Sequence, residues 1–389
     1  MIIGIPSETK PRENRVAMVP DNVLAMIKKG AKVLLESGAG MRAGYRDGDY
    51  EIAGAELVNN RRDVFDRSDI ILQVQSFGAN QESGAIDLER LKGDHLVIGM
   101  MDPLANPSAI QTFSASGASA LALELVPRIS RAQSMDVLSS MATLAGYKSV
   151  LLAAAAAPRM FPLLMTAAGT LSPARVLVMG AGVAGLQACA TAKRLGGIVE
   201  AYDVRPAAQE QIISVGAKPI DLDLDTGASE GSGGYAKDQG EEFLERQRDL
   251  MTAVIAEQDV IITTAAVPGA KSPILVTKEM VKAMKAGSVI VDLAAERGGN
   301  CELTQSGKTI NTNDITIIGP ENIPSSLAFH ASQMYGKNIE TLLNLILDDE
   351  GNLAMDRSDE IISETLVAED GEICHAAIRN LLGLQSLEK

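Results

Sequence analysis

A glycine-rich turn between an apolar strand and a helix constrains this chain more than any other feature. The stretch from Val176 to Gly185 reads V-L-V-M-G-A-G-V-A-G, and a helical pattern then continues to Leu195. Gly180 allows the tight turn off the strand, and Gly182 leaves the backbone bare where a pyrophosphate must approach. Gly185 lets the helix pack closely on the strand, so that its N-terminus faces the phosphate charge. This order of elements predicts a dinucleotide-binding unit.

An acidic residue follows at the spacing that such a unit requires. A second apolar strand, Ile198 to Tyr202, ends at Asp203, about 18 residues after Gly185. A carboxylate here can accept hydrogen bonds from both adenosine-ribose hydroxyls, and it repels the 2′-phosphate of NADP. The pattern favours NAD, although Arg205 leaves a phosphate partner within reach. The alternative is a glycine-rich turn in an unrelated α/β protein, which the acid disfavours.

Length and charge limit the class of protein. At 389 residues the chain is too long for one ordinary core, so two domains are expected. A net charge of -15 argues against nucleic acid and against an anionic membrane surface as partners. The three histidines and three cysteines do not cluster, which predicts reduced packing cysteines in a cytosolic protein and no metal site.

Neither the N-terminus nor the most apolar stretch predicts a membrane segment. The first six residues read as the start of a strand, without the charged and apolar regions of a signal peptide. The stretch from Val150 to Ala168 is interrupted by Pro158, Arg159 and Pro162. We interpret it as a buried, alanine-rich helix.

Short apolar runs recur at α/β spacing on both sides of the glycine-rich turn. They are Ile2–Ile5, Lys32–Leu35, Ile70–Val74, Leu96–Met100 and Ala118–Leu123 before it, and Lys218–Leu224, Asp259–Thr264, Ser288–Leu293 and Ile315–Ile318 after Asp203. The predicted fold class is α/β, with two Rossmann-like doubly wound domains separated by a cleft. The predicted domains are 1–140 plus 325–389, and 141–324, which binds the nucleotide. Leu144 to Met165 is expected to cross between them, and Ser325 to Leu347 to be a long helix returning to the first.

One stretch, 225–240, breaks this rhythm with five glycines and no apolar period. It is longer than most connections in such folds, so it is either a mobile lid or slack chain. A tyrosine, Tyr235, flanked by glycines and by Ala-Lys-Asp favours the lid.

Polar side chains are concentrated between Pro127 and Ser140, directly after a strand that ends near Leu125. Open α/β sheets bind ligands at the carboxyl ends of their strands, which makes this a candidate site. The alternative is a polar surface loop in which Asp136 caps a helix. Composition alone slightly favours the surface loop.

Over nearly its whole length the chain resembles the alanine dehydrogenase and nicotinamide nucleotide transhydrogenase superfamily. The motifs that carry the resemblance are Ile3–Lys10 (IGIPSETK), Glu13–Ala17 (ENRVA), the glycine-rich turn, Val267–Ala270 (VPGA) and Asp292–Ala294 (DLA).

The two branches of this superfamily differ in their chemistry. Alanine dehydrogenases bind and activate the amino acid with a Lys and a His, where this chain has Gln75 and Met101. It keeps Arg15, and Glu296 stands in place of a catalytic Asp. Oxidising an amino acid to an imine needs a base, whereas passing a hydride between two nicotinamide rings needs alignment and exclusion of water. The absence of the Lys and His therefore favours the transhydrogenase branch.

Three segments match the transhydrogenase branch specifically: the polar stretch with Arg128, Gln133, Asp136 and Ser139, the run Met141–Tyr147 (MATLAGY), and Gly233–Lys237 (GGYAK). The resemblance implies that Arg128 and Asp136 orient the nicotinamide end of NAD and that Ser139 contacts its carboxamide. It implies that Gln133 bridges the nicotinamide ribose and the incoming NADP ring. Gly234 and Tyr235 would close over the adenosine. The full set of implied NAD(H)-binding residues is Gly180, Ala181, Gly182, Val183, Gly185, Asp203, Val204, Arg205, Gly234, Tyr235, Gln247 and Ala266.

The resemblance also implies partners, because the chain is similar to the NAD(H)-binding first component of proton-translocating transhydrogenase. It has no second phosphate-binding motif, so NADP(H) is expected on a partner subunit and the proton pathway on a membrane-spanning subunit. No membrane helices precede Lys389, which favours the split form with this component as a separate polypeptide. We expect a homodimer in the cytoplasm, associated with the inner membrane through its partners. An NAD-dependent amino-acid dehydrogenase and a non-catalytic NAD-binding module are the alternatives.

Overall fold

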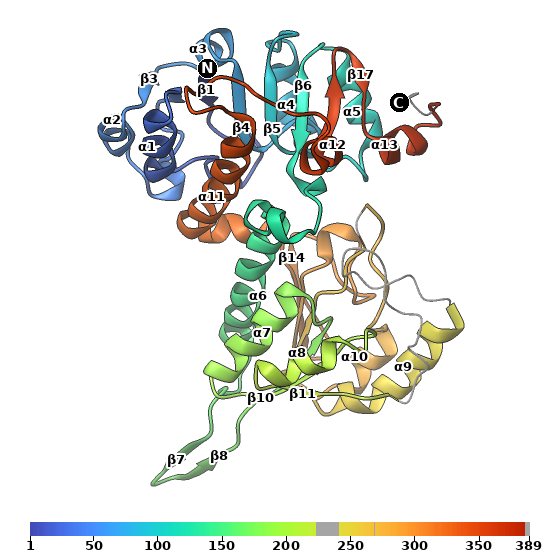
Figure 1. Ribbon diagram of the computed structural model, residues 1–389. Helices are drawn as coiled ribbons and strands as arrows, with labels where there is room; N and C mark the ends of the chain where they lie inside the picture. Colours follow the sequence, from blue (N-terminus) through green and yellow to red (C-terminus); the bar gives the residue numbers. More distant parts are fainter. Residues whose placement is uncertain (223–240, 268, 386–389) are drawn as a thin grey trace. The chain divides into compact units, whose positions relative to one another are not determined.

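The chain divides into two compact units in the computed structural model, which describes residues 1–222, 241–267 and 269–385, with only the backbone described for 241–244. Unit 1 comprises Met1–Met141 and Pro324–Lys389, and unit 2 comprises Ala142–Ile323 (Figure 1). Unit 1 is therefore assembled from both ends of the chain, and unit 2 from its middle.

Unit 1 is built on a sheet with the order β17-β16-β6-β5-β4-β1-β2-β3. Strands β3 to β6 in this order are parallel, and β16 and β17 add an antiparallel edge beside β6. The central strands are continuous apolar runs because helices cover both faces of a parallel sheet. The strands are β1 (Ile2–Ile5), β2 (Lys32–Glu36), β3 (Glu56–Val58), β4 (Ile70–Gln75), β5 (Leu96–Met100), β6 (Ser119–Ala122), β16 (Leu366–Glu369) and β17 (Glu372–Ile373). The helices are α1 (Pro20–Lys28), α2 (Asp47–Ala53), α3 (Arg61–Arg67), α4 (Gln81–Leu88), α5 (Pro107–Ser114), α11 (Ala328–Ile346), α12 (Glu360–Thr365) and α13 (Ala376–Leu381), with 3₁₀ turns η1 (Met41–Ala43), η2 (Phe77–Ala79), η3 (Leu123–Leu125) and η4 (Ser130–Met135).

A buried acid occupies the end of the first strand of unit 1, where a nucleotide-binding domain would carry its glycine turn. The carboxylate of Glu8 accepts hydrogen bonds from the backbone N–H groups of Val74 (2.6 Å) and Gln75 (3.1 Å). Burial, followed by the nearby Glu13, raises the pKa of Glu8 to about 8, although both N–H groups lower it. Because an internal carboxylate takes these strand-end donors, unit 1 offers no phosphate site at this position.

Unit 2 has the strand order β11-β10-β9-β12-β13-β15-β14, which is the doubly wound Rossmann order with β14 as an antiparallel edge. Along β9, Val176 and Val178 pack on one face of the sheet while Leu177 and Met179 pack on the other. The confirmed fold class is thus α/β with two Rossmann-like sheets. The strands are β7 (Leu164–Thr166), β8 (Gly169–Leu171), β9 (Arg175–Met179), β10 (Ile198–Tyr202), β11 (Lys218–Pro219), β12 (Val260–Thr263), β13 (Val289–Asp292), β14 (Lys308–Thr312) and β15 (Ile315–Gly319). The helices are α7 (Val183–Arg194), α8 (Ala208–Ser214), α9 (Glu241–Ala256) and α10 (Lys278–Ala283), with 3₁₀ turns η6 (Ala295–Arg297) and, at the boundary with unit 1, η7 (Ile323–Leu327).

The helix predicted over 144–165 is wrong at both ends. Helix α6 spans Val137–Ala156, and the hairpin of β7 and β8 follows, so no helix extends to Ala168. Proline lacks a backbone donor and its ring clashes with the preceding turn, which accounts for the end of α6 just before Pro158. The interpretation of 150–168 as one buried helix is therefore also wrong. By length and composition alone α6 would suffice to cross a membrane, a criterion that core helices also meet.

The contact between α6 and α7 requires a glycine. A Cβ added to Gly146 would lie 2.1 Å from the carbonyl oxygen of Ala184, so a larger residue would push the two helices apart. Ala184 belongs to the first turn of α7, which starts immediately after the glycine-rich turn. The close approach therefore helps to fix the position of that turn.

Two of the cysteines are fully enclosed. Cys189 and Cys301 are buried and unbridged, and burial raises the pKa of their thiols to about 12 and about 11. They are protonated packing residues, as predicted, whereas Cys374 is half-buried.

Candidate dinucleotide site

The glycine-rich turn has the geometry that its sequence predicts. Gly180 has a φ of 97°, in the left-handed region, and its N–H donates to the carbonyl of Tyr202 over 2.8 Å. A Cβ on Gly185 would lie only 1.8 Å from the carbonyl oxygen of Gly180, whereas a Cβ on Gly182 would meet nothing within 4 Å. Gly180 and Gly185 are thus required by the fold itself, and Gly182 leaves an open stretch of backbone at the start of α7. Ala181 and Val183 flank that open stretch.

Asp203 links the turn to the end of β10. Its carboxylate accepts a hydrogen bond from the N–H of Ala181 over 2.7 Å, so the acid lies directly beside the turn. It is also paired with Arg205, whose Nε and Nη2 each donate to it over 2.8 Å. Both side chains are largely buried. The arginine left open by the sequence as a phosphate partner is engaged by the carboxylate.

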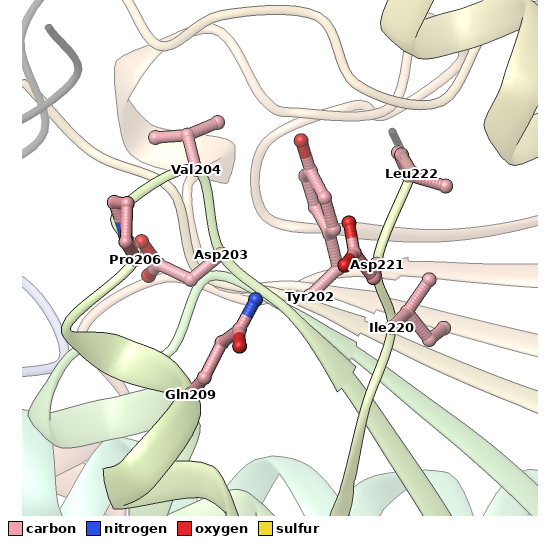
Figure 2. Close-up of a pocket in the computed structure, with 8 residues that line it drawn as sticks. All are labelled: Tyr202, Asp203, Val204, Pro206, Gln209, Ile220, Asp221 and Leu222. Atoms are coloured by element: carbon pink, nitrogen blue, oxygen red, sulfur yellow. The ribbon is translucent and has the colours of Figure 1, made fainter. Parts of the chain in front are cut away.

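A small hollow of about 30 Å³ lies beside Asp203 (Figure 2). Its lining comes from the end of β10, the start of α8 and the segment that follows β11. Two carboxylates, those of Asp203 and Asp221, line it, which makes it an unfavourable place for an additional anion. The lining residues are Tyr202, Asp203, Val204, Pro206, Gln209, Ile220, Asp221 and Leu222.

A buried amide on α9 reaches the same strand end. Gln247 Nε2 donates to the hydroxyl of Tyr202 over 2.8 Å, and burial raises the pKa of that hydroxyl. Gln247 is 2% exposed, and its Oε1 has no hydrogen-bond partner among the described residues. A buried acceptor without a partner is costly, so this oxygen is a candidate ligand contact.

The end of β12 completes this side of the site and was missed by the sequence analysis apart from Ala266. Thr264 Oγ1 donates to the carbonyl of Gly180 over 2.9 Å, and Asn300 Nδ2 donates to the carbonyl of Ala265 over 2.9 Å. Ala266 follows and is exposed. A Thr after the fourth strand and an Asn in a loop carry no spacing signal, so only the folded chain reveals them.

The polar segment in unit 1 forms a short 3₁₀ helix, η4, instead of an irregular loop. In a 3₁₀ helix residues i and i+3 share a face. Ala132 and Met135 are accordingly buried, while Ser130 and Gln133 are exposed. Arg128, just before η4, is also exposed.

Asp136 and Ser139 form the cap of α6. The N–H of Ser139 donates to Asp136 over 2.9 Å, and its hydroxyl donates to the same carboxylate over 2.5 Å. This is the helix-capping role that the surface-loop interpretation assigned to Asp136. A ligand role for either residue has to coexist with the cap.

The structure thus gathers the predicted residues into two groups. Unit 1 holds Arg128, Gln133, Asp136 and Ser139 within one short segment, and unit 2 holds the glycine-rich turn, Asp203 with its neighbours, Gln247 and Ala266 around one end of its sheet. Gly234 and Tyr235, and the lid predicted at 225–240, lie outside the described residues. In the part of the chain that the structure describes, no three His, Cys, Asp or Glu residues are grouped to hold a metal ion.

Fold and site together define a class: a two-unit α/β protein with a dinucleotide-binding turn in its second unit. The model of the Alanine dehydrogenase/PNT C-terminal domain matches residues 149–376, and that of the N-terminal domain matches 4–145. The chain belongs to this family.

Individual relatives divide between the two branches. A Rhodospirillum rubrum protein, the first of the parts that make up its NAD(P) transhydrogenase subunit alpha, is 43% identical over 380 residues, which cover 97% of this chain and 99% of the relative. Alanine dehydrogenase of Mycolicibacterium smegmatis is 28% identical over 391 residues, or 99% and 97% of the two chains. The crystal structure of a transhydrogenase from Sinorhizobium meliloti matches with a TM-score of 0.85 and 41% identity over 96% of this chain and 100% of that one. The chain is thus more similar to the transhydrogenases.

Proposed function

We propose that this chain is the NAD(H)-binding component of a proton-translocating NAD(P) transhydrogenase, and that it exchanges hydride between NADH and NADP⁺ held on a partner subunit. The observation that carries the proposal is the contact between Asp203 and the N–H of Ala181. It joins an acid suited to a free ribose and a turn suited to a pyrophosphate in one site. The similarity to transhydrogenase subunits supports the reaction.

The residues of unit 2 fit NAD(H). The open backbone at Gly182 and the N-terminus of α7 would hold the pyrophosphate, with Ala181 and Val183 beside it. Asp203 would hold the adenosine ribose, with Val204 and Arg205 next to it. Gln247, Ala266 and, by resemblance, Gly234 and Tyr235 would complete the contacts. When bound, the nicotinamide supplies the hydride.

The exposed residues of unit 1 would act at the reacting end. By resemblance, Gln133 would align the two nicotinamide rings, Arg128 and Asp136 would orient the ring of NAD, and Ser139 would contact its carboxamide. Hydride transfer between two such rings moves no proton at the reacting carbons, so these groups position rather than act as bases. Exposure of Gln133 is consistent with a reaction partner on another protein.

Partner subunits follow from this function. NADP(H) would be bound by a second component, and a membrane-spanning subunit would carry the proton, so that the chain lies in the cytoplasm at the inner membrane. A homodimer is supported by apolar side chains left exposed on and beside the β7–β8 hairpin, which are Met160, Leu163, Met165 and Leu171.

A specific observation weighs against amino-acid oxidation, the second candidate function. Arg15 is 2% exposed, and Glu13 accepts from its Nε over 2.8 Å and from its Nη2 over 2.6 Å. Gln75 Nε2 also points to Glu13, at 3.4 Å, so an amide stands where a substrate Lys would be expected. This neutral, closed cluster offers neither a base nor an unengaged cation for an amino acid.

We expect the purified chain to bind NADH and to show no alanine-dependent reduction of NAD⁺. The measurement is NADH absorbance with saturating alanine, beside an alanine dehydrogenase as the positive control. A turnover on the order of 10 per second, typical of dehydrogenases, would contradict the proposed function.

Mixing tests the proposal directly. The chain is combined with a separately purified NADP(H)-binding component, and hydride exchange between NADH and NADP⁺ is followed. Exchange is expected only when both components are present. NADH binding without exchange under all these conditions would instead support a non-catalytic NAD-binding module.

Two neighbouring glycines should fail in different ways when replaced. Gly182→Ala is expected to leave the melting temperature unchanged, because its Cβ meets nothing, but to weaken NADH binding about tenfold or more. Gly185→Ala is expected to destabilise unit 2 by about 1–3 kcal/mol, since its Cβ would overlap the carbonyl of Gly180. Thermal unfolding and NADH titration of both variants separate the effects. Unchanged NADH affinity in the folded Gly182→Ala protein would exclude the pyrophosphate position.

A further inference from the structure

The 3₁₀ helix η4, which carries Gln133, depends on neighbouring elements for its position. Short 3₁₀ helices have poor hydrogen-bond geometry and rarely persist alone. Its buried side chains are small in number: Ala132 and Met135 face the core, and the remaining residues face outward. An exposed residue on such a segment can be held accurately only if the segment's backbone is tied elsewhere.

A side chain from α11 makes such a tie. Asn338 Nδ2 donates to the carbonyl of Ser134 over 2.7 Å, and Ser134 is the residue directly after Gln133. Asn338 is 6% exposed, so a partner protein has almost no access to it. Its Oδ1 has no partner among the described residues, which makes the bond to Ser134 the sole side-chain hydrogen bond recorded for this amide. Burying an amide for one bond is unfavourable unless that bond serves a purpose.

A second tie holds the other side of η4. Both Nη atoms of Arg131 donate to the carboxylate of Asp359 over 2.7 Å, in a bidentate pair. Asp359 is itself fixed, because it accepts from the N–H of Ile361 and caps α12. Gln133 therefore lies between two tied neighbours in the sequence, Arg131 and Ser134.

We propose that Asn338 is a positioning residue for hydride transfer: it holds the backbone of η4 so that Gln133 keeps its place, and the Arg131–Asp359 pair supports it. The inference rests on the function proposed above for Gln133. Neither Asn338 nor Asp359 touches the nucleotides in this scheme. Their effect passes through the backbone of η4, where a displacement of about 1 Å can cost about a hundredfold in rate.

The test compares three variants with the wild-type protein. Asn338→Leu removes the donor, Asp359→Asn weakens the ion pair but keeps a side chain that can cap α12, and Thr341→Val is the matched control. Thr341 lies one turn further along α11, and its hydroxyl donates only to its own helix at Lys337. Single-turnover hydride transfer is measured with the NADP(H)-binding component present, together with NADH dissociation constants and hydrogen–deuterium exchange over residues 129–136.

Asn338→Leu is expected to slow hydride transfer at least tenfold, to leave the NADH dissociation constant within about twofold, and to speed amide exchange in η4. Asp359→Asn should do the same more weakly, and Thr341→Val should resemble the wild type. If Asn338→Leu does not fold, Asp359→Asn carries the test. Wild-type rates with unchanged exchange in η4 would overturn the inference alone, whereas absence of hydride transfer in the wild-type mixture would overturn the proposed function.

Discussion

Replacing Gln133 with Asn is expected to slow hydride transfer about a hundredfold while leaving NADH affinity nearly unchanged. The substitution keeps the amide but withdraws it by one methylene, which is enough to misalign two rings that must meet closely. Because Gln133 is exposed on η4, the shorter side chain removes no packing, and the melting temperature should not change. Single-turnover rates and NADH titrations on the same preparation provide the measurement.

The structure offers a matched control for this variant. Ser130 shares the exposed face of η4 with Gln133, one 3₁₀ turn earlier, so Ser130→Ala alters the same surface without touching the amide. It should transfer hydride at the wild-type rate. Equal losses of affinity and rate in Gln133→Asn would make this glutamine an ordinary binding residue.

Asp203→Ala is expected to weaken NADH binding by roughly 1.5–3 kcal/mol and to narrow the preference over NADPH. The first effect follows from the loss of charge-assisted hydrogen bonds to the ribose. The second follows from Arg205, whose guanidinium is paired with Asp203 and would be released toward a 2′-phosphate. Dissociation constants for NADH and NADPH, measured for both proteins, check both effects.

A double variant separates the two causes. In Asp203→Ala/Arg205→Gln the NADH loss should remain, but the gain in relative NADPH affinity should disappear. This discrimination matters for function, because a component that admitted NADPH to both sites would exchange hydride between identical carriers. Wild-type protein that binds NADPH as tightly as NADH would contradict the assignment of Asp203 and the division of nucleotides between components.

Where local rules acted alone, the sequence predicted the structure well. The glycine-rich turn needs a positive φ at Gly180 and no side chain at Gly185, and these are properties of a short stretch of backbone. The apolar runs of the central strands were found for the same reason, since strands buried on both faces are continuous in hydrophobic residues. The short or edge strands β3, β14 and β16 were missed because few residues and mixed exposure leave no such run.

The error over α6 shows how a local signal was overridden. Apolar composition suggested that the helix continues to Ala168, whereas the prolines end it near Ala156 and an exposed hairpin follows. Composition reports that a segment prefers to avoid water. It does not report whether another part of the chain covers that segment.

The sequence by itself determined the class of fold, the nucleotide turn and the acid beside it, because each depends on residues close together in the chain. The tertiary structure alone decided that Arg205 is paired with Asp203, that Glu8 closes the strand end of unit 1, and that η4 is tied from both sides. The ties to η4 join residues 204 and 228 positions apart. Contacts over such separations depend on which elements the topology brings together, and no local pattern of residues encodes that pairing.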